Sequence, residues 1–191
     1  MKLTGCDAEG LAAATALLNA GGVAVIPTDT VYGLAARPDF PDAVERLYSI
    51  KGRDAKKPIA LLAADAAAAA RFLGRELPPL AADLAALHWP GALTLVLPMR
   101  DGGHFEGLRV PNHDWTRRLL SSCGGVLRVT SANLSGCRPA TDAPAALADV
   151  GLSADMVVDD GISPGGAAST VVKIDELGAM TLLRQGPVSV R

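Results

Sequence analysis

Apolar residues along the chain form two kinds of pattern, short continuous runs and longer stretches in which apolar positions recur every three or four residues. The first kind is typical of buried strands and the second of amphipathic helices. The short runs predict strands at 23–26, 58–63, 92–99, 107–111, 125–130, 155–161, 169–174 and 179–184. The spaced pattern predicts helices at 8–20, 41–50, 65–74, 81–87, 114–123 and 145–151.

Local signals support several of these boundaries. Asp7 is suited to cap the first helix, Gly21-Gly22 to end it, and Pro41 to open the second. A polar segment rich in turn-forming residues, 131–144, predicts a loop. Because helices and strands are interleaved throughout, we expect an α/β (α+β) fold with a mixed sheet, as a single domain over residues 1–191.

Composition narrows the functional classes. Apolar residues make up 49% of the chain but aromatic residues only 4%, so alanine, leucine and valine must build the core. The net charge of −2 is unlike the basic surface of a dedicated nucleic-acid binder. Three scattered cysteines favour neither a disulfide framework nor a zinc site, and they indicate a reducing cytosol. The apolar stretch 11–27 is interrupted at Asn19, so we expect no membrane span and a cytoplasmic protein.

The usual nucleotide and hydrolase motifs are missing from the sequence. There is no phosphate-binding loop with a terminal Gly-Lys-Ser/Thr, no Gly-x-Gly-x-x-Gly after a strand, and no Gly-x-Ser-x-Gly elbow. His88, His104 and His113 show no metal-ligand spacing, and the favoured interpretation of each is structural. Candidate chemistry must therefore be sought in the polar clusters at strand ends.

Polar clusters follow several of the predicted strands and helices. They are "PTDTVYGL" from Pro27, "KGRDAKKP" from Lys51, "LRVPNH" from Leu108, "VTSANLSG" from Val129, "STVV" from Ser169 and "LLRQG" from Leu182. Each cluster alone has an ordinary structural interpretation, such as a turn or a solvated helix end. Together they combine hydroxyl groups and an amide with fixed positive charges, which is the set of groups that a polyphosphate site without a phosphate-binding loop requires.

In order and wording these clusters resemble the YrdC/TsaC family, the threonylcarbamoyl-AMP synthases. The resemblance rests on "IPTDTVYGL", Lys-Gly-Arg before Lys-Pro, "WPGALTLVL", "LRVP", "TSANLSG" and "STVV…LLRQG", and it extends from about Ala20 to Gly186. It implies a YrdC/RibB-like fold, in which a twisted mixed sheet flanked by helices surrounds a large, concave, positively charged cavity. The expected form is the short one with a single domain.

The resemblance also implies a reaction. Family members condense L-threonine, bicarbonate or CO2, and ATP into threonylcarbamoyl-AMP and release pyrophosphate. The product goes to a separate transferase complex that modifies an adenosine of tRNA, so contact with tRNA itself is expected to be indirect. ATP is expected as a substrate together with Mg2+, without a metal bound by protein side chains alone.

Site residues follow from the same resemblance, motif by motif. Lys51 and Arg53 would act on the ATP phosphates and are the expected catalytic residues. The other expected ATP contacts are Lys57, Ser131, Asn133 and Arg184, and the expected L-threonine contacts are Thr30, Arg109 and Ser169. Thr28 and Asp29 stay open between a ligand contact and a brace for the loop. No cysteine is expected to act as a nucleophile.

The sequence departs from the family pattern at two places, and two alternative functions are considered. Leu62 stands where many relatives carry a histidine near the threonine pocket, and "SGCRPATD" has no clear counterpart of a serine that touches ATP in relatives. One alternative is an RNA-binding module of the same fold, with a basic patch around 53–57 and Arg117-Arg118. The other is a carbamoyl-adenylate domain like that of hydrogenase-maturation carbamoyltransferases, which are much longer and carry zinc-finger parts.

Overall fold

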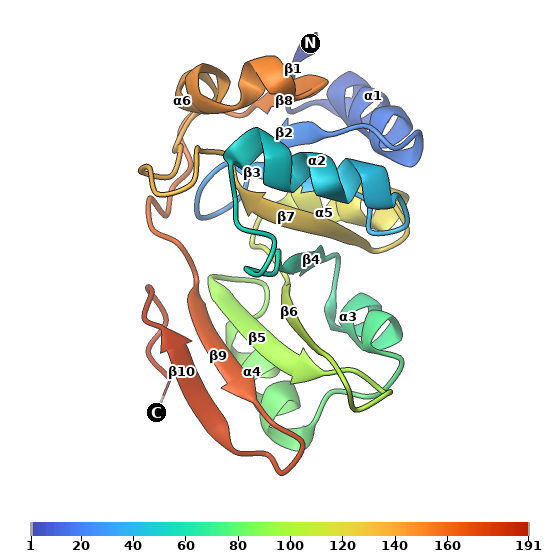
Figure 1. Ribbon diagram of the computed structural model, residues 1–191, viewed down its shortest axis with the longest axis vertical. Helices are drawn as coiled ribbons and strands as arrows, with labels where there is room; N and C mark the ends of the chain where they lie inside the picture. The colour runs from blue at the N-terminus through green and yellow to red at the C-terminus, as the bar shows by residue number, and fades with distance from the viewer. Residues whose placement is uncertain (1, 191) are drawn as a thin grey trace.

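Ten strands of the computed structural model, which describes residues 2–190, join into one mixed sheet in the order β1-β8-β2-β3-β7-β4-β6-β5-β9-β10 (Figure 1). The strands are β1 (Lys2–Gly5), β2 (Ala24–Ile26), β3 (Gly33–Ala36), β4 (Leu61–Ala63), β5 (Leu93–Pro98), β6 (Phe105–Arg109), β7 (Val126–Ser131), β8 (Met156–Asp159), β9 (Thr170–Ile174) and β10 (Met180–Arg184). The α-helices are α1 (Ala8–Asn19), α2 (Pro41–Lys51), α3 (Ala66–Leu73), α4 (Pro79–His88), α5 (Asp114–Ser122) and α6 (Ala143–Asp149), with a 3₁₀ turn at Gly151–Ser153.

The sheet combines parallel and antiparallel pairs, which confirms the predicted mixed α/β fold. β8 runs parallel to both β1 and β2, and β4–β6 and β5–β9 are also parallel pairs. The pairs β2–β3, β3–β7, β4–β7, β5–β6 and β9–β10 are antiparallel. All six predicted helices are present, with boundaries that differ by a few residues.

Two strands were not predicted from the sequence. β1 lies at one edge of the sheet and is mostly exposed, so it shows no apolar run. β3 is fully buried, but its sequence, Gly-Leu-Ala-Ala, has low strand propensity. At Gly33, a β-carbon would lie 2.5 Å from a methyl group of Val129, so glycine is required by the close approach of β7.

Alternate residues of the central strands face two separate hydrophobic cores, as the period of two in a strand requires. Along β2, Ala24 and Ile26 pack in the core formed with α1, α3, α4 and α5, whereas Val25 packs in the core formed with α2 and α6. Figure 1 shows α2 in front of this part of the sheet and α5 behind it. The upper half of the sheet is therefore covered on both faces.

The lower part of the sheet in Figure 1, which includes β5, β6 and β9, is covered by helices on one face only. Its residues Leu95, Leu108 and Val172 pack in the core that includes α3 and α4. The alternate residues, among them Thr94 and Val171, face a cavity on the opposite side. This uncovered face becomes the floor of the candidate site. No helix among residues 2–190 has the length and apolar character needed to cross a membrane.

Candidate active site

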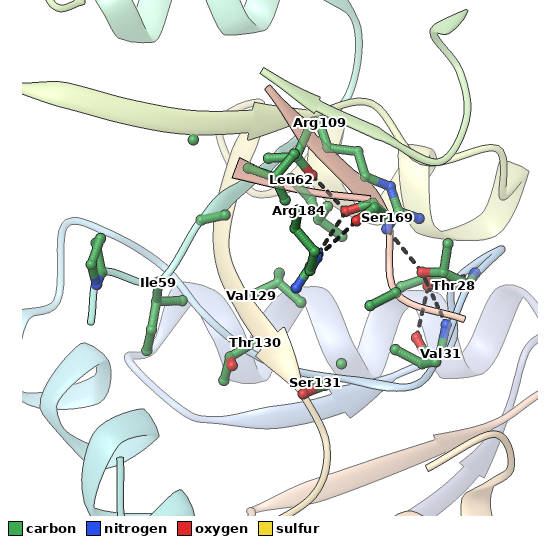
Figure 2. Close-up of a pocket in the computed structure, with 18 of the residues that line it drawn as sticks. Thr28, Val31, Ile59, Leu62, Arg109, Val129, Thr130, Ser131, Ser169 and Arg184 are labelled. Carbon is green, nitrogen blue, oxygen red and sulfur yellow. Dashed lines mark hydrogen bonds between the residues drawn. The ribbon is translucent and has the colours of Figure 1, made fainter. Parts of the chain in front are cut away.

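A cavity of about 400 Å³ lies where the two halves of the sheet meet (Figure 2). Such a volume is within the range of small-molecule sites. Segments far apart in the sequence form its walls: the loop after β2, the loop between α2 and β4, strands β5, β6 and β7, and the segments around Ser169 and Arg184. Among the residues described, its lining includes three arginines, Arg53, Arg109 and Arg184, and no carboxylate.

Arg109 is the most deeply buried of the three arginines and is held from three sides. Its Nε donates to the carbonyl of Gly91 at 3.0 Å, and its Nη1 donates to the hydroxyl of Thr30 at 2.8 Å. Its Nη2 donates to a carboxylate oxygen of Asp29, which forms a buried ion pair. Burial lowers the pKa of Arg109, the charge of Asp29 opposes that shift, and the charge of Arg184 adds to it.

The loop after β2 is organised by the hydroxyl of Thr28. This group donates to the carbonyl of Val31 at 2.7 Å and accepts from the backbone N–H groups of Thr30 and Val31 at 3.1 and 3.3 Å. The same oxygen lies 3.0 Å from the hydroxyl of Thr30. Thr28 therefore shapes the turn and also lines the cavity, whereas Asp29 pairs with Arg109.

Arg184 reaches the cavity from the end of β10 and is tied to Ser169. Its Nε donates to the Ser169 carbonyl at 2.9 Å, and its Nη2 donates to the Ser169 hydroxyl at 3.2 Å. That hydroxyl lies 2.8 Å from the hydroxyl of Thr94 on β5. In Figure 2, Arg109, Arg184 and Ser169 lie on one side of the cavity and Ser131 on the other. The pKa of Arg184 is lowered by burial and then by the positive charge of Arg53.

Arg53 enters the cavity from the loop that follows α2. Gly52, with φ +58°, ends this helix in the left-handed conformation that favours glycine. The Arg53 Nε donates to the carbonyl of Lys57 at 3.0 Å, and Nη2 donates to the carbonyl of Pro58 at 3.2 Å. The side chain of Lys57 is exposed and lies outside the lining of the cavity. Lys57 thus contributes a carbonyl that orients Arg53.

Lys51 and Asn133 lie behind the cavity wall. The Lys51 ammonium is buried and donates to the carbonyls of Ser131 and Asn133. Burial lowers the pKa of Lys51 to about 8, and the charge of Arg53 adds to this shift. The Asn133 amide donates to the carbonyls of Leu134 and Cys137, both at 2.8 Å. Of this group, only Ser131 lines the cavity.

A family model described as "Telomere recombination", which represents the Sua5, YciO and YrdC proteins, matches residues 16–186. The chain belongs to the Sua5/YciO/YrdC family. A threonylcarbamoyl-AMP synthase of Idiomarina loihiensis is 36% identical over 82% of this chain and 88% of its own length. That of Bacillus subtilis is 34% identical over 94% of this chain, which spans 54% of the Bacillus protein.

Solved structures agree with the family assignment. The crystal structure of P. abyssi Sua5 complexed with L-threonine matches with a TM-score of 0.89 and 29% identity. The match covers 97% of this chain and 58% of that one. The Sua5/YciO/YrdC fold predicted from the sequence is therefore confirmed, and the recognition of the family from its motifs is confirmed as well.

The fold brings six of the nine predicted site residues to the cavity of this Sua5/YciO/YrdC protein. They are Thr30, Arg53, Arg109, Ser131, Ser169 and Arg184. Lys51, Lys57 and Asn133 do not line it. Leu62 lines it as an apolar residue. Thr94 also lines the cavity and was not predicted, although it is a single hydroxyl within the apolar run 92–97.

Proposed function

We propose that the protein is an L-threonylcarbamoyl-AMP synthase, which condenses L-threonine, bicarbonate or CO2, and ATP and releases pyrophosphate. The observation that carries this proposal is the convergence of Arg53, Arg109 and Arg184 on one hydroxyl-lined cavity without a lining carboxylate. Arg53 and Arg184 have no acidic partner among the described residues, so an anion bound between the arginines would offset their repulsion. ATP and bicarbonate are anions, and L-threonine carries a carboxylate. Relatives named for this activity, matched over most of the chain, support the same reaction.

The wall formed by Arg109, Thr30 and Ser169 suits L-threonine. A guanidinium has five N–H donors. Arg109 uses one on each of its three nitrogens, which leaves one donor on Nη1 and one on Nη2 for the carboxylate of threonine. The Thr30 hydroxyl accepts from Arg109 and lies 3.0 Å from the Thr28 hydroxyl, so it is held beside the free Arg109 donors. We assign Thr30 as a hydrogen-bonding contact of threonine.

Arg53 and Arg184 suit the phosphates of ATP. Each directs two N–H groups to protein oxygens and retains three donors. Guanidinium groups bind phosphate oxygens in pairs and keep their charge at all relevant pH values. The Ser131 hydroxyl on the facing wall adds a neutral donor. Lys57 and Asn133 remain predicted ATP contacts, and in this structure each supports the wall from outside the lining.

Lys51 is better described as a positioning residue than as a group that touches substrate. Its ammonium joins the carbonyls of Ser131 and Asn133 and thereby fixes the end of β7 beside Arg53. The expected catalytic role of Lys51 stays a prediction. Its effect would reach ATP through Ser131, whose hydroxyl lies 3.4 Å from the Lys51 nitrogen.

The reaction needs two bond-forming steps. The neutral amine of threonine adds to the carbon of CO2 or bicarbonate and gives a carbamate; the CO2 route releases a proton from nitrogen to water, and the bicarbonate route releases water. A carbamate oxygen then attacks the α-phosphorus of ATP in line, and the bond to the pyrophosphate oxygen breaks. Both partners are anionic, so Arg53 and Arg184 lower the barrier by offsetting their repulsion. Holding the short-lived carbamate against ATP contributes by proximity.

Mg2+ fits this site only as a companion of ATP. Protein-bound Mg2+ is held by one or two carboxylates together with substrate phosphates. The described lining offers hydroxyl groups but no carboxylate, so the ion would depend on the phosphates and water for its ligands. The arginines then carry the protein's own share of charge stabilisation.

The product is a mixed anhydride, and we propose that it passes in the cytoplasm to a transferase complex that modifies tRNA. The RNA-binding alternative is not favoured. Two of its basic residues have other partners, because Arg53 lines the cavity and Arg117 pairs with Asp114. Contact with tRNA is therefore proposed to be indirect.

Pyrophosphate release tests the proposal. The protein is incubated with ATP, L-threonine and bicarbonate, and each substrate is omitted in turn; release should require all three. Arg53→Ala should lower the rate at least about 100-fold, because one donor to the developing charge is worth that much in comparable sites. Arg100→Ala, an exposed arginine outside the cavity, is the matched control. Release that does not depend on threonine would overturn the proposal.

A further inference from the structure

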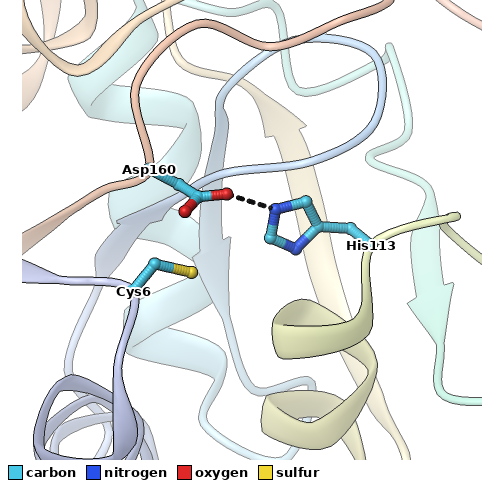
Figure 3. A group of neighbouring side chains, drawn as sticks. All are labelled: Cys6, His113 and Asp160. Atoms are coloured by element: carbon cyan, nitrogen blue, oxygen red, sulfur yellow. Dashed lines mark hydrogen bonds and ion pairs between the residues drawn. The ribbon is translucent and has the colours of Figure 1, made fainter.

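Cys6, His113 and Asp160 come together at one end of the sheet, outside the arginine cavity (Figure 3). β1 and β8 are parallel neighbours with Gly5 paired to Asp159, so Cys6 and Asp160 directly follow adjacent strand ends. His113 is the N-cap of α5. One ligand atom from each of the three side chains lies within 4.8 Å of the other two.

The three side chains offer ligand types that Zn2+ accepts. Zinc binds thiolate at about 2.3 Å and imidazole or carboxylate at about 2.0–2.2 Å in tetrahedral geometry, which places ligand atoms roughly 3.3–3.6 Å apart. The His113 Nε2 lies 2.9 Å from a carboxylate oxygen of Asp160, as Figure 3 shows. Closing the group around an ion therefore requires small side-chain rotations. Asp160 is exposed, so it can rotate and an ion can enter from solvent.

The hydrogen bonds of His113 can adapt to a bound ion. Its Nδ1 accepts from the backbone N–H of Thr116 at 3.2 Å and lies 3.0 Å from the Thr116 hydroxyl. That hydroxyl donates to the carbonyl of Pro27 at 2.8 Å and so keeps a free lone pair. When Nε2 binds a metal, the imidazole proton moves to Nδ1 and can be donated to the Thr116 hydroxyl, in exchange for the hydrogen bond from the Thr116 N–H that caps α5. Such a partner fixes the tautomer and orientation of a ligating histidine.

The backbone around the cluster is already fixed. The indole N–H of Trp115 donates to the carbonyl of Asp7 at 3.0 Å, which ties α5 to the turn that carries Cys6. The N–H of Asp160 donates to the hydroxyl of Tyr32 at 3.0 Å. Tyr32 also lines the arginine cavity, so this hydrogen bond connects the cluster to the cavity wall.

A nucleophilic role for Cys6 is not supported. Burial raises the pKa of its thiol to about 12, and the charge of Asp160 adds to the shift, so the sulfur keeps its proton. His113 directs Nε2 to Asp160 instead of to the thiol. A metal ion changes this situation, because a coordinated thiol releases its proton and the ion offsets the negative charges of both acidic ligands.

We propose that Cys6, His113 and Asp160 form a three-ligand Zn2+ site with a fourth position open to water. The bound ion would join the ends of β1 and β8 to α5 and brace the loop from Pro27 to Tyr32. The proposal does not depend on the assignment of the synthase reaction.

Metal binding to the full chain tests the site. The protein is treated with a chelator, desalted and titrated with Zn2+ in competition with a chromophoric chelator. It is titrated separately with Co2+, whose thiolate complex has a charge-transfer band in the near ultraviolet. We expect one equivalent of each ion to bind and the cobalt complex to show the thiolate band. A cobalt complex without this band would overturn the proposal.

Variants identify the ligands. Cys6→Ser and Asp160→Asn preserve side-chain size and should weaken Zn2+ binding by more than the about 10–100-fold that loss of an outer-shell partner costs. Cys137→Ser, at an exposed free cysteine, and His104→Gln, at the exposed His104–Asp101 pair, should leave it unchanged. Circular dichroism verifies that each variant is folded. Unchanged affinity in folded Cys6→Ser, or an equal loss in Cys137→Ser, would show that the ion binds elsewhere.

Discussion

Removal of the Asp29 carboxylate should destabilise the protein far more than removal of a surface charge. Both side chains of the Asp29–Arg109 ion pair are nearly buried, with 11% and 8% of their surface exposed. In Asp29→Ala, the guanidinium would keep only neutral acceptors, the Thr30 hydroxyl and the Gly91 carbonyl. Removing one partner of a buried pair costs about 3–5 kcal/mol, because the remaining charge is left uncompensated.

This free energy predicts a measurable change in melting temperature. An unfolding entropy of about 2.1 cal/mol/K per residue gives roughly 0.4 kcal/mol/K for a chain of this length. A loss of 3–5 kcal/mol therefore lowers the melting temperature by about 7–12 °C. Glu176→Ala, which breaks the half-exposed Arg75–Glu176 pair, is the matched control and should cost no more than about 1 kcal/mol.

A double-mutant cycle separates the charge effect from lost packing. We expect Asp29→Ala combined with Arg109→Met to be less destabilised than the sum of the two single variants, because the double variant contains no unpaired buried charge. Urea denaturation of the four proteins gives the coupling free energy. Additive effects, or a cost for Asp29→Ala no larger than that for Glu176→Ala, would refute the assignment of Asp29 as the counter-ion that keeps Arg109 in place.

Two further predictions concern the walls of the cavity. The pKa of Lys51, lowered from its ordinary value to about 8, means that the folded state releases this proton before the unfolded state does. The free-energy cost of burying the charged Lys51 is complete below pH 8 and disappears between pH 8 and about 10.5. Urea denaturation should therefore show that wild type gains stability relative to Lys51→Met over that window. Parallel pH profiles of the two proteins would contradict this prediction. A β-carbon on Gly165 would lie 2.5 Å from the Asp29 carbonyl and 3.0 Å from the Thr30 α-carbon. Gly165→Ala should therefore raise KM for threonine by about tenfold in the pyrophosphate assay, whereas Gly103→Ala, in open space, should not; equal KM values would contradict it.

The sequence was sufficient to predict most helices and strands and to recognise the family, because hydrophobic periodicity and long motifs can each be read within one segment of the chain. It was insufficient where tertiary packing overrides local propensity. β3 is made of residues that seldom form strands, and it is a strand because β2 and β7 pair with both of its edges. β1 is mostly exposed, and pairing with β8 rather than an apolar pattern makes it a strand.

The same limit applies to the side chains of the site. The basic segment at 51–57 predicts positive charge near a ligand, but it cannot distinguish Arg53, which enters the cavity, from Lys51, which is buried under Ser131. The distinction depends on Gly52, which ends α2 between them. Asp29 was ambiguous for a related reason, since its partner is distant in sequence. Cys6 and Asp160 become neighbours only through the β1–β8 register.

The three arginines of the cavity lie close enough for their charges to repel one another. Burial lowers the pKa of Arg109 and of Arg184, and the charge of Arg184 adds to the first shift and that of Arg53 to the second. Of these three arginines, only Arg109 has an acidic partner among the described residues. A site optimised for stability alone would pair or remove the other two charges. Their retention is explained if the phosphates of ATP supply the missing negative charge, so that substrate binding relieves a repulsion built into the fold and draws the anionic carbamate and ATP to the same place.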